Sequence, residues 1–165
     1  TVFRCYPDGV EKLPSSRVLQ TDWELPQEPG DGRGVDPAVI PLRPGSLRVV
    51  VSDLLTPEDP DAILRPLVRD RGRAVILVPY DAGEAAPDWS GNMELVNCES
   101  GAVKRQRISR DLMEHYRQAY RRHMDSWRSR SRALGIGFAR VPSGVPLATA
   151  FQEEALPAGI VEPWT

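Results

Sequence analysis

The sequence has few cysteines and no long apolar run, and both shortages limit what the protein can be. Two cysteines, Cys5 and Cys98, lie far apart in a chain of 165 residues, a count that fits neither a disulfide framework nor a zinc site. We expect both to be small buried residues in a reducing compartment. No stretch approaches the roughly 18 apolar residues of a membrane span, and no basic-then-apolar signal segment opens the chain. These absences predict a cytoplasmic protein without a membrane span.

Catalytic motifs are missing as well. The sequence contains neither a Gly-x-Ser-x-Gly nucleophile turn nor a Gly-x-x-x-x-Gly-Lys phosphate loop. The two histidines, His115 and His123, are not four residues apart, the spacing that a zinc-binding helix uses. His123 falls on the apolar stripe of a predicted helix, so we expect it to be packed or hydrogen bonded. The sequence therefore favours a protein that is not an enzyme.

What the sequence does contain is an ordered series of strand and helix patterns. Apolar or β-branched runs predict strands at 2–6, 10–13, 47–51, 74–78, 93–97, 102–108 and 136–141. Apolar residues at helical spacing predict helices at 57–71, 109–134 and 147–156, and segments rich in proline and glycine predict loops at 26–45 and 79–91. A strand, a helix and a strand joined by short links are typical of a right-handed βαβ unit. We expect one α/β domain over residues 1–165, with a parallel sheet and a β-hairpin.

The strand predicted at 47–51 raises the main question about function. Its apolar residues do not alternate with polar ones, which predicts burial on both faces. Ser52 and Asp53 follow it directly, and a carboxylate at the end of a strand can be a metal ligand or a catalytic acid. The simpler interpretation is an Asp53 side chain that accepts a hydrogen bond from nearby backbone N–H groups.

Basic residues are concentrated in one segment. Residues 101–140 carry 11 basic and 3 acidic side chains, whereas residues 1–100 carry 10 basic and 17 acidic ones. The candidate binding residues of this segment lie on the long predicted helix; they are Arg117, Arg121, Arg122 and Arg128. Clustered arginines among aromatic residues can bind phosphate backbones, and the alternative is a solvated helix face against an acidic remainder. Trp89, in a loop rich in proline and glycine, is a candidate anchor for a protein partner.

The order of these segments resembles the C-terminal part of the bacterial domain-of-unknown-function-58 family, which carries a domain like von Willebrand factor type A. The segments that carry the resemblance are VVVSDLL, LRPLVRDRG, AVILVPYD, GNMELVNCESGAVKRQR and DLMEHYRQAYRRHMDSWRSRSRALGIGFARVPSGVPLATAF. They cover residues 46–165, and residues 1–45 match weakly. The resemblance implies a three-layer, Rossmann-like sheet flanked by helices, either complete or lacking its first strand.

The resemblance also says where a divalent cation would bind. In metal-binding relatives the ligands are an Asp-x-Ser-x-Ser loop, a Thr and an Asp, and Asp53 matches that Asp. Mg²⁺ prefers six oxygen ligands, so one carboxylate cannot hold it. The sequence has no Asp-x-Ser-x-Ser, and Val35 stands where the family often has the Thr. Either the missing strand and loop precede Thr1 in a longer protein, or the site is a degenerate metal-ion-dependent adhesion site.

The resemblance implies a non-enzymatic adaptor domain that binds other proteins, with a MoxR-type AAA+ ATPase as one partner. Two alternatives stay open: an Asp53-centred, metal-dependent enzyme using Mg²⁺, and a nucleic-acid binder that uses the arginine-rich helix 110–132. If the first strand is absent, the sheet exposes an edge, which leaves a homo-oligomer open as well.

Overall fold

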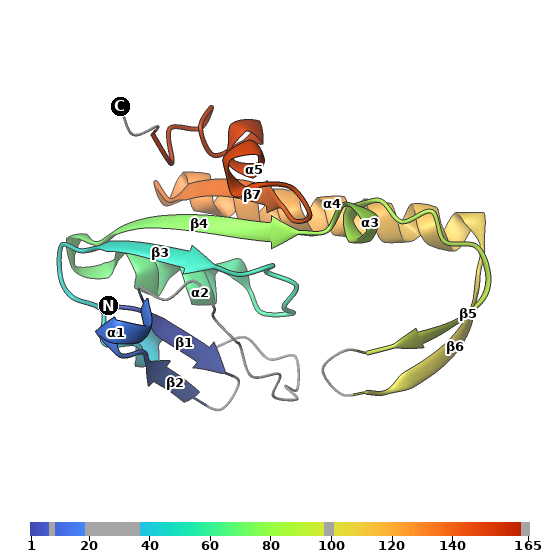
Figure 1. Ribbon diagram of the computed structural model, residues 1–165, viewed down its shortest axis with the longest axis horizontal. Helices are drawn as coiled ribbons and strands as arrows, with labels where there is room; N and C mark the ends of the chain where they lie inside the picture. Colours follow the sequence, from blue (N-terminus) through green and yellow to red (C-terminus); the bar gives the residue numbers. More distant parts are fainter. Residues whose placement is uncertain (7–8, 19–36, 98–100, 163–165) are drawn as a thin grey trace.

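The computed structural model describes residues 1–6, 9–18, 37–97 and 101–162, and its elements follow the predicted order (Figure 1). The strands are β1 (Phe3–Tyr6), β2 (Gly9–Lys12), β3 (Leu47–Val51), β4 (Arg73–Tyr80), β5 (Gly91–Val96), β6 (Val103–Ile108) and β7 (Gly137–Pro142). The α-helices are α1 (Ser15–Val18), α2 (Pro60–Val68), α3 (Ala82–Ala85), α4 (Arg110–Ala133) and α5 (Leu147–Glu153), and the 3₁₀ turns are η1 (Pro37–Val39) and η2 (Arg69–Arg71). The mixed α/β class is confirmed. Most of the loop predicted at 26–45, with Val35, lies outside the described residues.

The main sheet has three parallel strands in the order β3-β4-β7. Val49 lies opposite Val75 on β4, and Ile76 on β4 lies opposite Phe138 on β7. Parallel neighbours require a crossover: α2 lies in the connection from β3 to β4, and α4 lies in the connection from β4 to β7. The predicted βαβ unit is therefore present.

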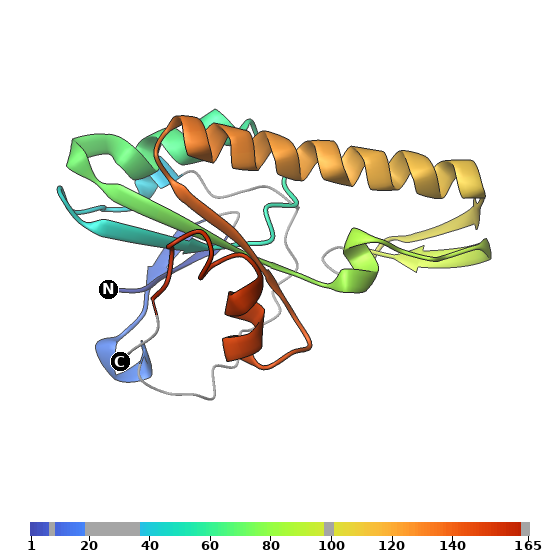
Figure 2. The same cartoon turned by 90° about the horizontal axis from the view of Figure 1, so that it is seen from above.

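The helices α2 and α4 cover one face of this sheet (Figure 2). Leu64 from α2, Trp127 from α4, and Ile76 and Val78 from β4 are fully buried between them. Each of these side chains removes a large apolar surface from water, which stabilises the fold by roughly 1.5–3 kcal/mol per aliphatic residue. This layer is the hydrophobic core of the described part of the protein.

The start of each long helix follows from its capping residue. The Asp59 carboxylate accepts a hydrogen bond from the Asp61 N–H at 2.8 Å, and Pro60 occupies the first turn of α2. The Ser109 hydroxyl accepts a hydrogen bond from the Leu112 N–H at 3.2 Å at the start of α4. The sequence offers Thr56 or Asp59 as the cap of the first of these helices and Ser109 as the cap of the second, and the structure uses Asp59 and Ser109.

The other face of the sheet is covered only in part. The helix α5 packs on β7 on this side of the sheet (Figure 2). At the opposite margin, Leu47, Val49 and Val51 of β3 keep 59%, 57% and 65% of their surface exposed. The prediction that this strand is buried on both faces is wrong, because α2 and α4 cover one face and no described element covers the other at β3.

The one charged side chain of β3 points into the protein. Arg48 is only 5% exposed. Its guanidinium donates hydrogen bonds to the carbonyl oxygens of Leu67 at 2.7 Å, Arg69 at 3.0 Å and Arg43 at 3.1 Å. The bonds to Leu67 and Arg69 satisfy carbonyls at the C-terminal end of α2, where a cation also complements the helix dipole, and the bond to Arg43 reaches the loop before β3. Gly72 makes room for this arrangement, since a Cβ there would lie 2.4 Å from the guanidinium carbon.

The strands predicted at 2–6 and 10–13 form one hairpin, those predicted at 93–97 and 102–108 form another, and each hairpin is a separate two-stranded sheet. We call β5 and β6 together the ribbon. In the ribbon Val96 lies opposite Val103, and Glu94 lies opposite Arg105 and accepts a hydrogen bond from it at 3.0 Å. The ribbon joins the rest of the chain at the N-terminal end of α4 and is set apart from the main sheet (Figure 1). Its contacts are mainly between its own two strands.

Three sequence-based expectations differ from the structure. The loop predicted at 79–91 contains the short helix α3, which begins at an Asp81 N-cap. The apolar spacing in the helix predicted at 109–134 includes Ala119, but Ala119 is exposed, whereas Met113 and Met124 are buried. Cys5 is an exposed thiol rather than a buried one, and Cys98 lies outside the described residues.

Within the described ranges, no helix combines the length and the apolar character needed to cross a bilayer.

Candidate functional site

Asp53 lies in the turn that follows β3, at the carboxyl end of the parallel sheet. Its side chain is exposed, and one carboxylate oxygen accepts a hydrogen bond from the Leu55 N–H at 3.2 Å. The interpretation of Asp53 as a carboxylate bonded to nearby backbone is confirmed. The next residue, Leu54, is 2% exposed and has a positive φ of 57°, an unusual conformation for a bulky residue. The surrounding contacts therefore have to hold this turn in place.

His123 of α4 supplies one of those contacts. Its Nε2 atom lies 2.7 Å from the Leu54 carbonyl oxygen and 3.1 Å from the indole Nε1 of Trp127. A neutral ring nitrogen cannot donate to the first and accept from the second at once. We assign the proton to Nε2, because an unprotonated nitrogen at 2.7 Å would repel the carbonyl oxygen. The prediction of a hydrogen-bonded histidine is confirmed, and its role is to anchor the turn that carries Asp53.

Among the described residues, Asp53 belongs to no cluster of acidic, histidine or cysteine side chains that could hold a metal ion. Across residues 1–6, 9–18, 37–97 and 101–162, no three His, Cys, Asp or Glu side chains are grouped closely enough to hold a metal ion. Oxygen ligands of Mg²⁺ have to converge on one point. The described side chains around Asp53 therefore do not make a magnesium site by themselves.

Beside this turn, the carboxyl ends of β4 and β7 carry a cation between aromatic rings. The Arg140 guanidinium lies 3.9 Å from the centre of the Tyr80 ring and 5.8 Å from that of Tyr120. Glu154 accepts a hydrogen bond from the Arg140 backbone N–H at 3.0 Å, and from Arg128 at 2.6 Å. The carboxylate near Arg140 is thus already engaged, and stacking on the rings holds the guanidinium in place.

The tyrosines of this region are not activated as bases. Burial is the main cause that raises the pKa of Tyr120, and Asp53 and Glu84 raise it further. Burial likewise raises the pKa of Tyr80, and the nearby Glu153 carboxylate adds to this shift. Phenols whose pKa lies above its ordinary value of about 10 stay protonated at neutral pH. They can donate hydrogen bonds there, but they cannot act as general bases.

Most candidate arginines of α4 have partners within the protein. Arg117 donates to the Pro87 carbonyl oxygen at 2.5 Å, which ties α4 to the segment after α3. Arg121 lies 3.4 Å from Glu114 on the same helix, and Arg128 pairs with Glu154. Arg122 is exposed. The structure does not bring the four predicted arginines together as one uncommitted cluster.

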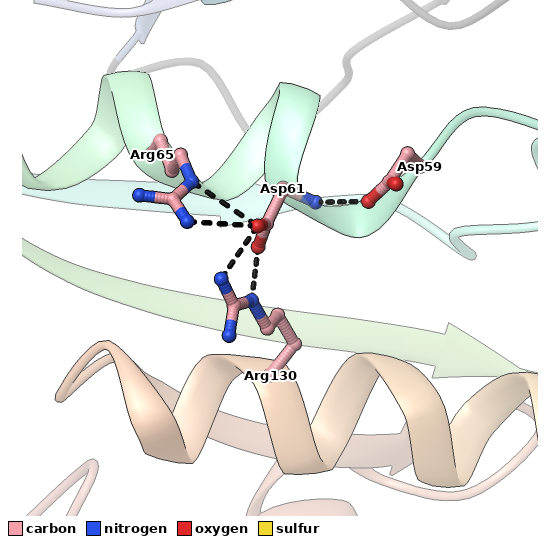
Figure 3. Close-up of polar contacts among 4 residues, drawn as sticks. All are labelled: Asp59, Asp61, Arg65 and Arg130. Carbon is pink, nitrogen blue, oxygen red and sulfur yellow. Dashed lines mark hydrogen bonds and ion pairs between the residues drawn. The ribbon is translucent and has the colours of Figure 1, made fainter.

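A two-bond ion pair joins the same helix to α2 (Figure 3). Arg130 donates from both Nε and Nη2 to the two oxygens of Asp61, and Arg65 contacts the same carboxylate at 3.0 Å. The hydrogen bond from Arg130 is the main cause that lowers the pKa of Asp61. Asp61 and Arg130, with Asp59, line a shallow open hollow. A carboxylate held by two guanidinium groups links α2 to α4 and is satisfied without a ligand.

Trp89 and the ribbon are the exposed features near the first turns of α4. Trp89 keeps 39% of its surface exposed just before β5 begins. At the far end of the ribbon, the cross-strand pair Val96 and Val103 is 62% and 57% exposed. The exposed cations of β6 are Lys104, Arg105 and Arg107. Sequence reasoning predicted the hairpin but missed this surface, although two valines beside a basic run are the signal that indicates it.

Comparison of the chain with protein-family models, with curated proteins and with solved structures gives no match. The resemblance to the von Willebrand factor type A-like family therefore stays a prediction. A function for this chain has to be argued from the surfaces that its own residues form.

Proposed function

We propose that the chain is a non-enzymatic, protein-binding domain whose ribbon contacts an acidic partner protein. The observation that carries the proposal is the exposed pair Val96 and Val103, which shares one face of the ribbon with the exposed Arg105 and Arg107. An apolar centre bordered by cations suits a protein surface that offers an apolar patch among carboxylates. Trp89 at the base of the ribbon would extend this contact.

The energetics of a two-stranded sheet support this proposal. An isolated hairpin is marginally stable in water, and the ribbon has few contacts outside its own strands. Burial of its two valines against a partner would add the apolar contacts that the ribbon lacks. Its charge would raise the rate of encounter with an acidic surface.

The arrangement of the sheet supports a von Willebrand factor type A-like architecture as part of the same proposal. Three parallel strands have α2 and α4 on one face and α5 on the other, which is the layer order that the resemblance implies. A MoxR-type AAA+ ATPase is the partner class that this resemblance favours. The β3 edge and the ribbon are the two surfaces that the described residues leave open to a partner.

The test compares what two variants of the full chain capture from a lysate of the source cell. The ribbon variant combines Val96→Thr, Val103→Thr, Arg105→Gln and Arg107→Gln, which keep strand propensity and remove the apolar pair and two charges. The matched control combines Val39→Thr, Val145→Thr, Arg71→Gln and Arg132→Gln at exposed positions elsewhere. We expect a protein that the wild type and the control capture and the ribbon variant loses. Equal capture by all three would contradict the proposal.

Nucleic acid is the second candidate, because a two-stranded basic ribbon can enter a major groove. Fluorescence anisotropy with a duplex probe separates the two. Binding of the duplex that weakens steeply with salt, and that the ribbon variant loses, would favour the nucleic-acid binder. The absence of any such binding would leave the protein partner as the better explanation.

The metal-dependent enzyme is the weakest candidate, because the described residues contain no group of three His, Cys, Asp or Glu side chains that could hold a metal ion. Calorimetric titration with Mg²⁺ tests it directly. A binding heat that disappears in Asp53→Ala would restore this alternative.

A further inference from the structure

We propose that the outer edge of β3 is a docking site for one extended peptide strand, which would add to the main sheet as a fourth strand. The peptide has apolar residues at alternate positions, a cation at one end and an anion at the other. This surface is separate from the ribbon, and its test does not depend on the ribbon's partner.

The backbone of β3 offers the hydrogen bonds for such pairing. The Ser46 carbonyl accepts from the Arg73 N–H at 3.0 Å, and the Ser52 N–H donates to the Leu77 carbonyl at 3.2 Å. Both groups therefore point toward β4. In a strand, neighbouring residues alternate in direction, so Leu47, Val49 and Val51 point their N–H and C=O groups away from β4. Among the described residues no strand pairs with that edge.

The side chains of the same three residues offer apolar contact. Leu47, Val49 and Val51 are all more than half exposed, on the face of the sheet that α5 covers only at β7. An added strand would place alternate side chains beside them, as cross-strand neighbours do in a sheet. Apolar residues at the matching positions of the peptide would bury this strip.

Within the described residues, β3 carries neither proline nor an outward-pointing charged side chain, although it is only five residues long and its Arg48 points inward, two features that also limit pairing at an edge. Natural edges are commonly guarded by charged side chains or proline. The one charged residue of β3 is Arg48, and its guanidinium is buried against carbonyls of α2 and the preceding loop. The edge therefore presents uncharged side chains along its whole length.

Charged residues at the two ends of the apolar strip formed by Leu47, Val49 and Val51 determine which peptide sequence binds best. Exposed Arg43 and Arg73 lie at the start of β3, and exposed Asp53 lies just past its end. A peptide bound antiparallel to β3 would bring its N-terminal end to Asp53 and its C-terminal end to the two arginines. Charge complementarity thus favours a cation near the peptide's N-terminus and an anion near its C-terminus.

The position of the β1–β2 hairpin favours a single strand over a second copy of the chain. In Figure 1 this hairpin lies on the same side of β3 as the unpaired edge. A second copy would bring its own β4 and β7 along with its β3, and this sheet would have to pass the hairpin. An extended peptide needs only the width of one strand.

The test uses the synthetic peptide Lys-Thr-Val-Thr-Val-Thr-Val-Glu with blocked ends and a fluorescent label, and the full chain. We expect saturable binding by anisotropy. Val49→Pro removes one N–H from the outer edge without removing a bond to β4, because that N–H points outward. This variant should weaken binding by at least about tenfold. Val49→Thr, which keeps the N–H, should weaken it much less.

Two further measurements complete the test. Circular dichroism and the thermal midpoint establish that Val49→Pro stays folded. If this variant unfolds, the same peptide N-methylated at its central residues replaces it and should lose binding to the wild type. Equal binding by the peptide and its N-methylated form, or no binding at all, would overturn the proposal. Sedimentation velocity showing a dimer that Val49→Pro dissociates would also overturn it, because the occupant would then be a second copy.

Discussion

At the residue scale, two polar side chains hold the ends of β3 in place. Arg48 bonds carbonyls that end α2, and His123 bonds the Leu54 carbonyl in the turn that carries Asp53. Sequence periodicity predicts neither contact. A charged residue in a strand is expected to point its side chain outward, whereas the Arg48 side chain points inward. Each joins residues that are far apart in the chain. The Asp53 hydrogen bond could be predicted because its partner is two residues away.

The first prediction concerns Arg48. The Arg48→Met variant keeps much of the side-chain volume and leaves several carbonyls without a donor. We expect the free energy of unfolding to fall by about 2–3 kcal/mol. The matched control is Arg73→Met, an exposed arginine on the neighbouring strand, which should change it by less than about 0.5 kcal/mol. Urea unfolding measures both, and equal losses would contradict the role given to Arg48.

The second prediction concerns Asp61 and acid. Its pKa is lower in the folded chain than its ordinary value because Arg130 and Arg65 bond the carboxylate. A lowered pKa contributes stability that is present above the ordinary value of about 4 and is lost as the pH falls through the folded value. We expect Asp61→Asn to melt below the wild type at neutral pH, with the gap closing in acid. The control Asp88→Asn changes an exposed carboxylate. A gap that stays constant down to about pH 2 would contradict this account.

At the element scale, the sequence predicts the order of strands and helices well, since each carries its own local signal. Turn residues mark the hairpins, and capping residues mark α2 and α4. Exposure is predicted less well: the run at 47–51 reads as a buried strand, but its burial depends on what covers it. Whether the outer face of this strand is covered depends on where α5 packs, and the residues of β3 carry no local signal for the position of α5. The short helix α3 has too few residues to show a period.

The third prediction separates the ribbon from the sheet. In the described part of the chain no layer covers the ribbon, whereas Ile76 and Val78 of β4 are fully buried. Local opening costs little free energy where few buried apolar contacts hold an element. In hydrogen exchange, we expect amides paired between β5 and β6 to exchange at least about 100-fold faster than those of the central strand β4. Equal protection would mean that the ribbon is packed more firmly than its contacts indicate.

At the scale of the whole molecule, the described residues form one packed layer and leave two surfaces open. The core between the sheet and the helices α2 and α4 buries Trp127 and Leu64 completely. The outer edge of β3 and the far end of the ribbon each expose apolar residues that no described element covers. Isolated exposed apolar residues are common on proteins, but both of these groups are contiguous along a strand or a strand pair. Their separation in the structure predicts two independent binding events.

The most direct test of the central claim is photocrosslinking from the far end of the ribbon. Val96→p-benzoylphenylalanine places the reactive group beside Val103, and Val145→p-benzoylphenylalanine is the control at another exposed valine. In the source cell, the account predicts a crosslinked protein from position 96 that position 145 does not give. The same crosslink should disappear when Arg105→Gln and Arg107→Gln are added. Identical products from both positions, or a product from position 96 that these charge changes leave intact, would contradict the ribbon as the binding surface.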